Sequence, residues 1–158
     1  MCSSDLNFIG GFTYTPRDWI SATYLLTAGD FGWIGKGYDH SIVLNVKPMD
    51  RLQWILLSDL NAIEANDGSN LQAHSVVNYL IYSIMDEVGV GARFEWWQKN
   101  SVSYYEVTGG FNLALLPNLM IRPEGRYQWG PGETASANNP AGVPVNVGLF
   151  GVDVILKF

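Results

Sequence analysis

Charged side chains recur at every second position in two stretches of the sequence. Arg93 and Glu95 do so in VGARFEWW, and Arg122, Glu124 and Arg126 do so in LMIRPEGRYQW. Because successive side chains of an extended strand point to opposite faces, this spacing puts these charges on one face of a sheet. Such a ladder of mixed charge could orient and filter polar solutes, as rings of charged side chains do in pores. The structural alternative is that the pairs brace the sheet or simply lie in water, where they contribute little energy.

Other residue types that could do chemistry are sparse. His40 and His74, the only two histidines, could hold a metal at a rim or act as a base beside Ser41 or Ser75, but neither has a neighbour at ligand spacing. The segment 67–70 (DGSN) lacks the acidic repeat and the distal Glu of an EF-hand, so it is predicted to be a turn. We therefore predict no enzyme activity, no catalytic residue, no cofactor and no metal site.

The composition limits the class of protein. Only 15% of the residues are charged, against roughly 25% in an ordinary soluble domain. Six Trp, eight Tyr and 17 Gly favour a β-protein, since aromatic residues prefer strands and glycine breaks helices. The net charge of -6 and only nine dispersed Lys and Arg residues argue against a nucleic-acid partner. The single cysteine, Cys2, excludes a disulfide within the chain.

The longest uncharged runs are too short or too interrupted for a helix that crosses a membrane. They cover residues 71–85 and 107–121, and the second contains two glycines and a proline. A transmembrane helix needs about 20 mostly apolar residues. Any membrane contact would therefore be made by strands.

Strand-like segments of about ten residues recur along the chain. They are expected at 7–15, 18–28, 40–47, 51–60, 73–83, 88–97, 103–115, 119–129 and the C-terminal stretch. Short turns alternate with longer loops, expected at 29–39, 61–70, 98–101 and 130–144. This order predicts an all-β fold, an antiparallel up-and-down meander of about nine strands of the kind found in transmembrane β-barrels. Segments 51–63 and 71–88 also match helical spacing, and we predict them to be strands.

From Phe158 back to Phe150, the C-terminal stretch GLFGVDVILKF alternates between apolar and other residues, with Ile155 as the only exception. One face would carry Phe150, Val152, Val154, Leu156 and Phe158, while Asp153 would lie on the other face, with the charged ladder. A large apolar final residue suggests a strand end anchored in something other than water. In a membrane barrel the apolar face would meet lipid and the charged face would meet the lumen.

Aromatic residues cluster toward the expected strand ends. Trp96, Tyr127, Trp129 and Phe158 lie there. Girdles of aromatic side chains mark the two membrane interfaces of outer-membrane barrels. The positions of these residues fit such girdles.

At VGARFEWW and LPNLMIRPEGRYQW the sequence resembles bacterial outer-membrane porins of the OmpL-like β-barrel porin family, mainly over residues 88–158. The resemblance implies a Gram-negative outer-membrane protein that forms a water-filled channel for passive diffusion of small hydrophilic solutes or ions. The residues expected to line this pore are Arg93, Glu95, Arg122, Glu124, Arg126 and Asp153. The terminal alternation is similar to the signal by which the barrel-assembly machinery selects its clients, with Phe150, Val152, Val154, Leu156 and Phe158 as its residues.

The expected strand number is odd, whereas bacterial single-chain barrels have an even number. We therefore expect residues 7–158 to be the C-terminal part of a barrel that is incomplete here. Residues 1–6 (MCSSDL) resemble a translated adapter remnant and are expected to be non-native.

Two other functions compete with the porin. One is a non-channel outer-membrane barrel that serves as a structural anchor or adhesin, and the other is a soluble all-β domain that binds a ligand. The expected partners are outer-membrane lipid, the barrel-assembly machinery and small polar solutes. The sequence leaves open homo-oligomer formation, the solute, the ion selectivity and the pore size.

Overall fold

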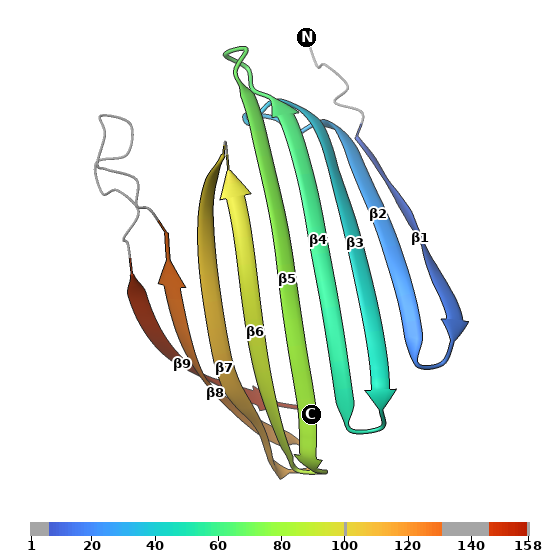
Figure 1. Cartoon of the computed structure of the whole chain (residues 1–158), viewed down its shortest axis with the longest axis vertical. Coiled ribbons are helices and arrows are strands. Elements are labelled where there is room, and N and C mark those ends of the chain that lie inside the picture. The colour runs from blue at the N-terminus through green and yellow to red at the C-terminus, as the bar shows by residue number, and fades with distance from the viewer. Residues whose placement is uncertain (1–6, 100, 131–145, 158) are drawn as a thin grey trace.

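The computed structural model describes residues 7–99, 101–130 and 146–157, which form one nine-stranded sheet (Figure 1). Its strands are β1 (Phe8–Arg17), β2 (Ile20–Asp30), β3 (Lys36–Met49), β4 (Leu52–Glu64), β5 (Asn70–Met85), β6 (Val88–Lys99), β7 (Val102–Leu116), β8 (Leu119–Trp129) and β9 (Val147–Leu156). Each strand pairs antiparallel with its neighbours in sequence order. The predicted up-and-down meander is therefore confirmed. The sheet is open, with β1 and β9 as its edges.

The two segments with helical spacing are strands, as predicted. They form β4 and β5, which pair with each other without interruption from Leu52↔Tyr82 to Glu64↔Asn70. The described part of the chain has no helix that is long and apolar enough to cross a membrane.

The connections divide between the two ends of the sheet. Two-residue turns follow β1, β3, β5 and β7, all at one end (Figure 1). The opposite end carries the other connections, but three of the expected long loops are shorter than predicted, at 31–35, at 65–69 and between Lys99 and Val102. The prediction was wrong there because polar and Gly-containing residues at the strand ends still pair, as Gly29↔Gly37 does. Most of the expected loop 130–144 lies outside the described residues.

Pro123 lies in the middle of β8 and causes no register shift there. The pairs Gly110↔Glu124 and Leu113↔Ile121 keep one register on either side of it, and the ladder omits the two pairs between them. Proline has no N–H to donate to the ladder. The missing donor therefore interrupts the pairing without shifting it.

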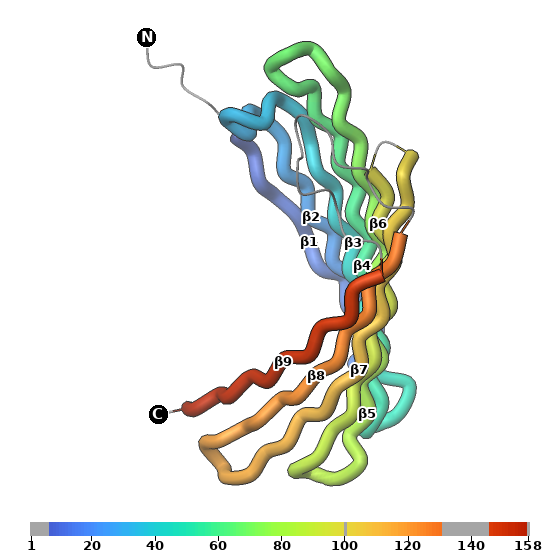
Figure 2. Tube along the Cα trace, turned by 90° about the vertical axis from the view of Figure 1, so that its left-hand side faces the viewer, coloured from blue at the N-terminus to red at the C-terminus, as the bar shows by residue number. Residues whose placement is uncertain are grey.

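The sheet is strongly curved (Figure 2), and its two faces differ in burial. Ile63, Val77, Glu106 and Thr108 are buried. The strand register places all four on the same face. Because a curved sheet crowds the side chains on its inner side, we identify this face as the concave one.

The convex face is apolar and open to the surroundings. Its exposed large side chains include Phe8, Phe12, Tyr14, Tyr38, Ile42, Leu60, Leu80, Tyr82, Phe94, Val107, Phe111, Tyr127, Phe150, Val152, Val154 and Leu156. Among its paired residues, charge occurs only at the two ends of the sheet, on Asp30, Lys36 and Glu64 at the loop end and on Arg17 at the turn end. A soluble monomer rarely exposes a contiguous apolar patch of more than a few hundred Å². The sheet therefore has the polarity of a wall with water on its concave side.

A glycine pair on the concave face gives a test of this packing. Gly91 and Gly110 are directly opposite each other. A Cβ at Gly110 would lie 2.8 Å from the Pro123 carbonyl oxygen, whereas one at Gly91 would meet nothing closer than the Leu80 carbonyl at 4.0 Å. We expect Gly110→Ala to lower the free energy of unfolding by about 1–3 kcal/mol through overpacking, as measured by denaturant titration in lipid. Gly91→Ala is the matched control and should be neutral or slightly stabilising; equal losses would contradict this packing.

Candidate functional site

The concave face of β6, β7 and β8 carries the charged ladder. The register aligns Arg93, Thr108 and Arg126 in one cross-strand row. The next row toward the loop end contains Glu95, Glu106 and Gln128. Two carboxylates therefore stand side by side beside a row that carries two guanidinium groups. This alternation of rows compensates the repulsion that like charges directly opposite would cause.

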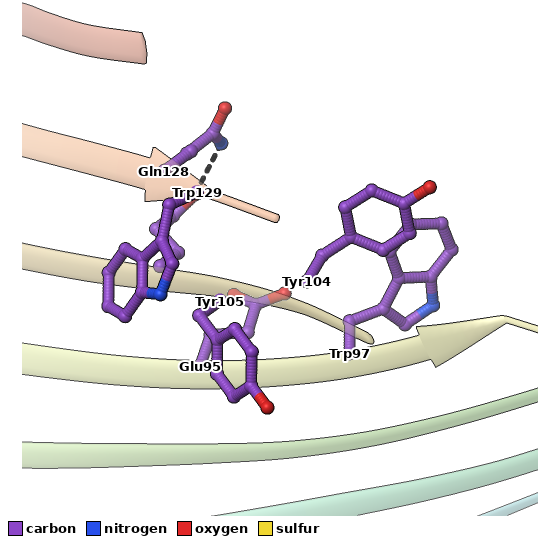
Figure 3. Close-up of a pocket in the computed structure, with 7 residues that line it drawn as sticks. Glu95, Trp97, Tyr104, Tyr105, Gln128 and Trp129 are labelled. Carbon is purple, nitrogen blue, oxygen red and sulfur yellow. Dashed lines mark hydrogen bonds between the residues drawn. The ribbon is translucent and has the colours of Figure 1, made fainter. Parts of the chain in front are cut away.

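A pocket of about 160 Å³ lies at the loop-side end of the ladder (Figure 3). Its residues on the concave face are Glu95, Trp97, Tyr104, Glu106 and Gln128, and Tyr105 and Trp129 reach it from the other face. The Trp97 and Tyr104 rings are 5.1 Å apart, and Trp97 is 38% exposed. The site thus offers an aromatic surface beside hydrogen-bond acceptors to a polar solute.

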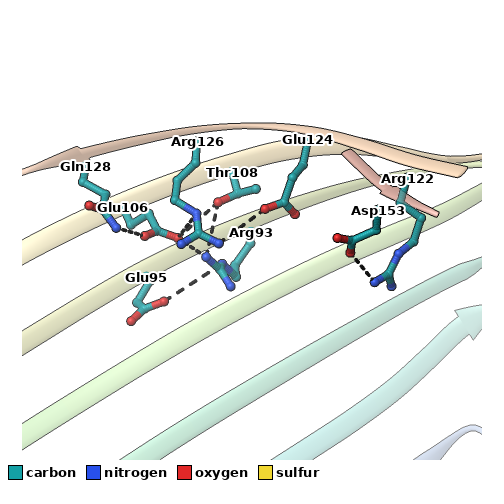
Figure 4. A network of polar contacts seen from close by, with 9 residues as sticks. All are labelled: Arg93, Glu95, Glu106, Thr108, Arg122, Glu124, Arg126, Gln128 and Asp153. Atoms are coloured by element: carbon teal, nitrogen blue, oxygen red, sulfur yellow. Dashed lines mark hydrogen bonds and ion pairs between the residues drawn. The ribbon is translucent and has the colours of Figure 1, made fainter. Parts of the chain in front are cut away.

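Glu106 is the centre of the polar network (Figure 4). Its carboxylate accepts hydrogen bonds from an Arg93 Nη, from Thr108 Oγ1 at 3.1 Å and from Gln128 Nε2 at 2.5 Å. Arg126 Nε lies 3.4 Å from the same carboxylate. Because the Glu106 side chain is only 10% exposed, these bonds are formed in a partly dehydrated place where charge-assisted hydrogen bonds are strong.

Arg93 joins three strands. Besides Glu106, its guanidinium lies 5.9 Å from the centre of the Tyr79 ring on β5 and within 4.0 Å of Glu95 on its own strand. Its Nε is buried and makes no hydrogen bond with the described residues. Arg93 and Glu106, the least exposed members of the ladder, thus act chiefly as a brace across β5, β6 and β7.

The remaining ladder residues are open to solvent. Arg122 on β8 donates to Asp153 on β9 at 2.7 Å, with side chains 45% and 65% exposed. Glu124 lies 3.4 Å from Arg126. These side chains are available to a passing solute, and surface pairs of this kind stabilise a fold by only about 0–1 kcal/mol.

The structure therefore places all six predicted pore residues on the concave face: Arg93, Glu95, Arg122, Glu124, Arg126 and Asp153. It divides them between a buried brace and an exposed wall. Their role as the lining of a pore stays a prediction.

Sequence reasoning underrated or missed several partners of the ladder. Glu106, Thr108, Gln128 and Tyr79 are not among the six residues that the sequence predicted to line the pore. Glu106, Thr108 and Gln128 occupy alternate positions of two neighbouring strands and point to the same face as the ladder. This alternation was a usable signal, but the pairing register that joins Glu106 to both arginines cannot be read from spacing alone.

The histidines lie on the convex face, away from the serines that they were considered to activate. His40 shares a 2.5 Å hydrogen bond with the Tyr24 hydroxyl, and His74 lies beside the Trp96 ring. Ser41 and Ser75 point to the concave face, where both hydroxyls donate to Asp59. Neighbouring side chains of a strand point to opposite faces, so neither His–Ser pair has the geometry of a base and a nucleophile. Among the described residues, no three His, Cys, Asp or Glu side chains form a metal site.

The predicted turn at 67–70 is present where β4 leads into β5. Asp67 Oδ1 accepts hydrogen bonds from Ser69 Oγ at 2.6 Å and from Ser69 N at 2.9 Å. These two bonds, led by that of the hydroxyl, hold the pKa of the Asp67 carboxyl below its usual value. The Asp67 carboxylate thus stabilises the turn to which it belongs.

The aromatic residues near the loop end form a stack on the convex face. The Tyr105 and Trp129 rings are 5.6 Å apart and those of Tyr127 and Trp129 5.8 Å apart. Trp96, on the same face, donates from Nε1 to Ser103 at 3.2 Å. The stack is placed as the expected interfacial girdle requires, whereas Phe158 lies outside the described residues.

The C-terminal strand keeps its predicted alternation. Phe150, Val152, Val154 and Leu156 share the convex face and are all more than half exposed. Asp153 lies on the concave face opposite Arg122. The fifth residue of the predicted assembly signal, Phe158, is outside the described part of the chain.

The model of a family described as "Putative beta-barrel porin-2, OmpL-like" matches residues 3–158. No curated protein matches the chain. The family match extends over the strands upstream of residue 88, where the sequence motifs had carried no resemblance.

Two carboxylates of the ladder give a matched test of the brace. Glu106→Gln removes the charge that faces Arg93 in a nearly buried place, and we expect it to lower the free energy of unfolding by up to about 3 kcal/mol. Asp153→Asn removes the partner of Arg122 at an exposed pair and should cost less than about 1 kcal/mol. Denaturant titration in lipid measures both, and an equal cost would contradict the division into brace and wall.

Proposed function

The chain belongs to the OmpL-like β-barrel porin family, and we propose that its barrel forms a water-filled channel through which small hydrophilic solutes and ions diffuse. The observation that carries this proposal is the distribution of polarity. An apolar, exposed convex face and a charged concave face suit a wall between lipid and water. The proposed activity makes and breaks no covalent bond.

The strand lengths support a membrane-spanning wall. β8 has 11 residues. The steps from its first residue to its last, at a rise of roughly 3.4 Å each and a tilt of about 40°, cover about 26 Å across the membrane. The apolar band of an outer-membrane barrel is about 25 Å tall. The Tyr105–Trp129 stack would then lie at the interface on the loop side, where aromatic girdles form.

We place the exposed ladder residues in the wall of the channel. Arg122, Glu124 and Asp153 combine both signs of charge on solvent-exposed side chains. A solute that passes them would meet a field across the lumen that favours one orientation of its dipole. Arg93 and Glu106 would keep the wall behind them rigid.

The proposal also includes the location and assembly of the barrel. We place it in the bacterial outer membrane, with lipid against the convex face. The alternating strand that ends in Phe158 would be recognised by the barrel-assembly machinery during insertion. Its apolar side chains, Phe150, Val152, Val154 and Leu156, lie on the convex face, which we assign to lipid.

Conductance in a planar bilayer tests the channel. The wild-type protein, purified in detergent and reconstituted, should give stepwise conductance. Charge reversal by Arg122→Glu with Arg126→Glu should raise the preference for cations over anions, as measured by the reversal potential in a salt gradient. Lys36→Glu makes a charge reversal at the loop end, on the convex face, and should leave the preference nearly unchanged.

Each failure has a distinct meaning. Absence of conductance from a membrane-inserted protein would favour the anchor or adhesin. A protein that stays soluble without detergent would mean that the concave and convex faces have been assigned to the wrong solvents.

A pair of lysine substitutions on β9 tests the membrane orientation. Val152 and Leu149 are each 51% exposed, on the convex and concave faces respectively. Val152→Lys would put a charge in lipid near the middle of the strand and should cost about 2–4 kcal/mol of stability in a bilayer. Leu149→Lys leaves its charge in water and should cost less than about 1 kcal/mol. A larger loss from Leu149→Lys would overturn the proposed orientation.

A further inference from the structure

The charges of the concave face are not balanced evenly across the sheet. On β6 to β9 each arginine is paired: Arg93 and Arg126 with Glu106, and Arg122 with Asp153. Glu95 and Glu124 are additional carboxylates at the edges of this group. The ladder therefore contains three guanidinium groups and four carboxylates, and it offers an anion no arginine that lacks a carboxylate partner.

A second group of carboxylates stands on β3 and β4. Asp39 and Asp59 share the concave face, since Asp39 is opposite Asn61 and Asp59 is opposite Ser41 in the register. This diagonal placement separates their Cα atoms by about 7–8 Å. Neither residue forms an ion pair with a described residue, because all described pairs are made by other side chains.

The nearest basic residues are too distant or already paired. Lys36 is bound to Asp30 at 3.6 Å and belongs to the convex face. Lys99 lies in the same cross-strand row as Asp39, but three strands away, which is roughly 14 Å at about 4.8 Å per strand. This distance exceeds the Debye length of about 8 Å at physiological ionic strength. Within residues 7–99, 101–130 and 146–157, no lysine or arginine is thus a close counter-charge for this pair of carboxylates.

The surroundings of Asp59 hold its carboxylate in place. Ser41 Oγ donates to one carboxylate oxygen at 2.5 Å and Ser75 Oγ to the other at 3.1 Å. These two bonds fix the direction of the carboxylate on the wall. Both Asp39 and Asp59 remain partly open to solvent.

We propose that Asp39 and Asp59 make the channel cation-selective. This inference rests on the proposed channel function and adds the residues that set its selectivity. A permeating small cation, inorganic or ammonium, supplies the counter-charge that the wall lacks at β3 and β4. The arginines of β6 and β8 are each paired with a carboxylate and therefore attract an anion less. Two carboxylates, of which Asp59 is held by two hydroxyl groups, favour entry of a cation without the multiple ligands that would trap it.

The reversal potential of reconstituted full-length protein in a KCl gradient tests the proposal. The wild type should pass K⁺ in preference to Cl⁻. Asp39→Asn with Asp59→Asn should lower the ratio of K⁺ to Cl⁻ permeability at least roughly twofold, since a unit charge a few ångströms from an ion in water changes its energy by an amount comparable to thermal energy. The wild-type preference should be larger at about 0.1 M salt than at about 1 M, where screening shortens the Debye length to about 3 Å.

Asp67→Asn is the matched control, because it removes one carboxylate from the exposed turn at 65–69 and should leave the ratio unchanged. Circular dichroism in detergent establishes that each variant is folded, and the single substitutions Asp39→Asn and Asp59→Asn replace the double variant if it does not fold. Stepwise conductance that is unselective, anion-selective or insensitive to these substitutions would overturn the inference and leave the channel standing. A wild-type protein that inserts but does not conduct would overturn both.

Discussion

The apolar convex face is the constraint on which the rest of this sheet depends. A surface of this kind is stable only away from water, and a lipid environment in turn requires that every backbone N–H and C=O in it be paired. Antiparallel pairing of each strand with its neighbours from β1 to β9 meets that requirement through most of the sheet, with an interruption at Pro123. At the edges it is met only when β1 and β9 each have a strand beside them, so closure into a barrel follows from the same constraint that makes the convex face apolar.

Because the convex face is apolar, any polar function is confined to the concave face. Burial then decides which polar residues of that face can contact a solute. Crowding on the concave side of a curved sheet removes Glu106 and much of Arg93 from water. Charges in that position must satisfy one another, so they stabilise the wall and are not free to meet a solute. Arg122 and Asp153 lie nearer the edge of the sheet and stay hydrated. In the proposed channel, the two interpretations of the ladder that the sequence left open, filter and brace, would therefore apply to different members of it.

Much of the fold could be predicted because β6, β8 and β9 alternate between apolar and polar or glycine positions over most of their length. β4 and β5 could be mistaken for helices because their concave face also carries aliphatic residues, among them Ile55, Leu57, Val77 and Ile81. Two apolar faces erase the period of two. The strands also run further than expected toward the loop end, since polar residues there are paired by backbone hydrogen bonds that do not depend on side-chain type.

The ladder itself could be predicted from the alternation of charged positions along each strand. Its central residue, Glu106, could not, because the register between strands decides which residues lie opposite each other. Glu106 is a single carboxylate in an otherwise uncharged strand, and only its alignment with Glu95 and Gln128 places it between two arginines. The same limit applies to Asp39 and Asp59, which are 20 residues apart in the chain and become neighbours through the pairing of β3 with β4. An arginine that is bound to a carboxylate adds stiffness to a wall but little net field, because the two charges largely cancel beyond a few ångströms. The field that an ion experiences in such a wall is therefore set by the carboxylates that pairing leaves over, and these are the residues that the spacing of the sequence reveals least.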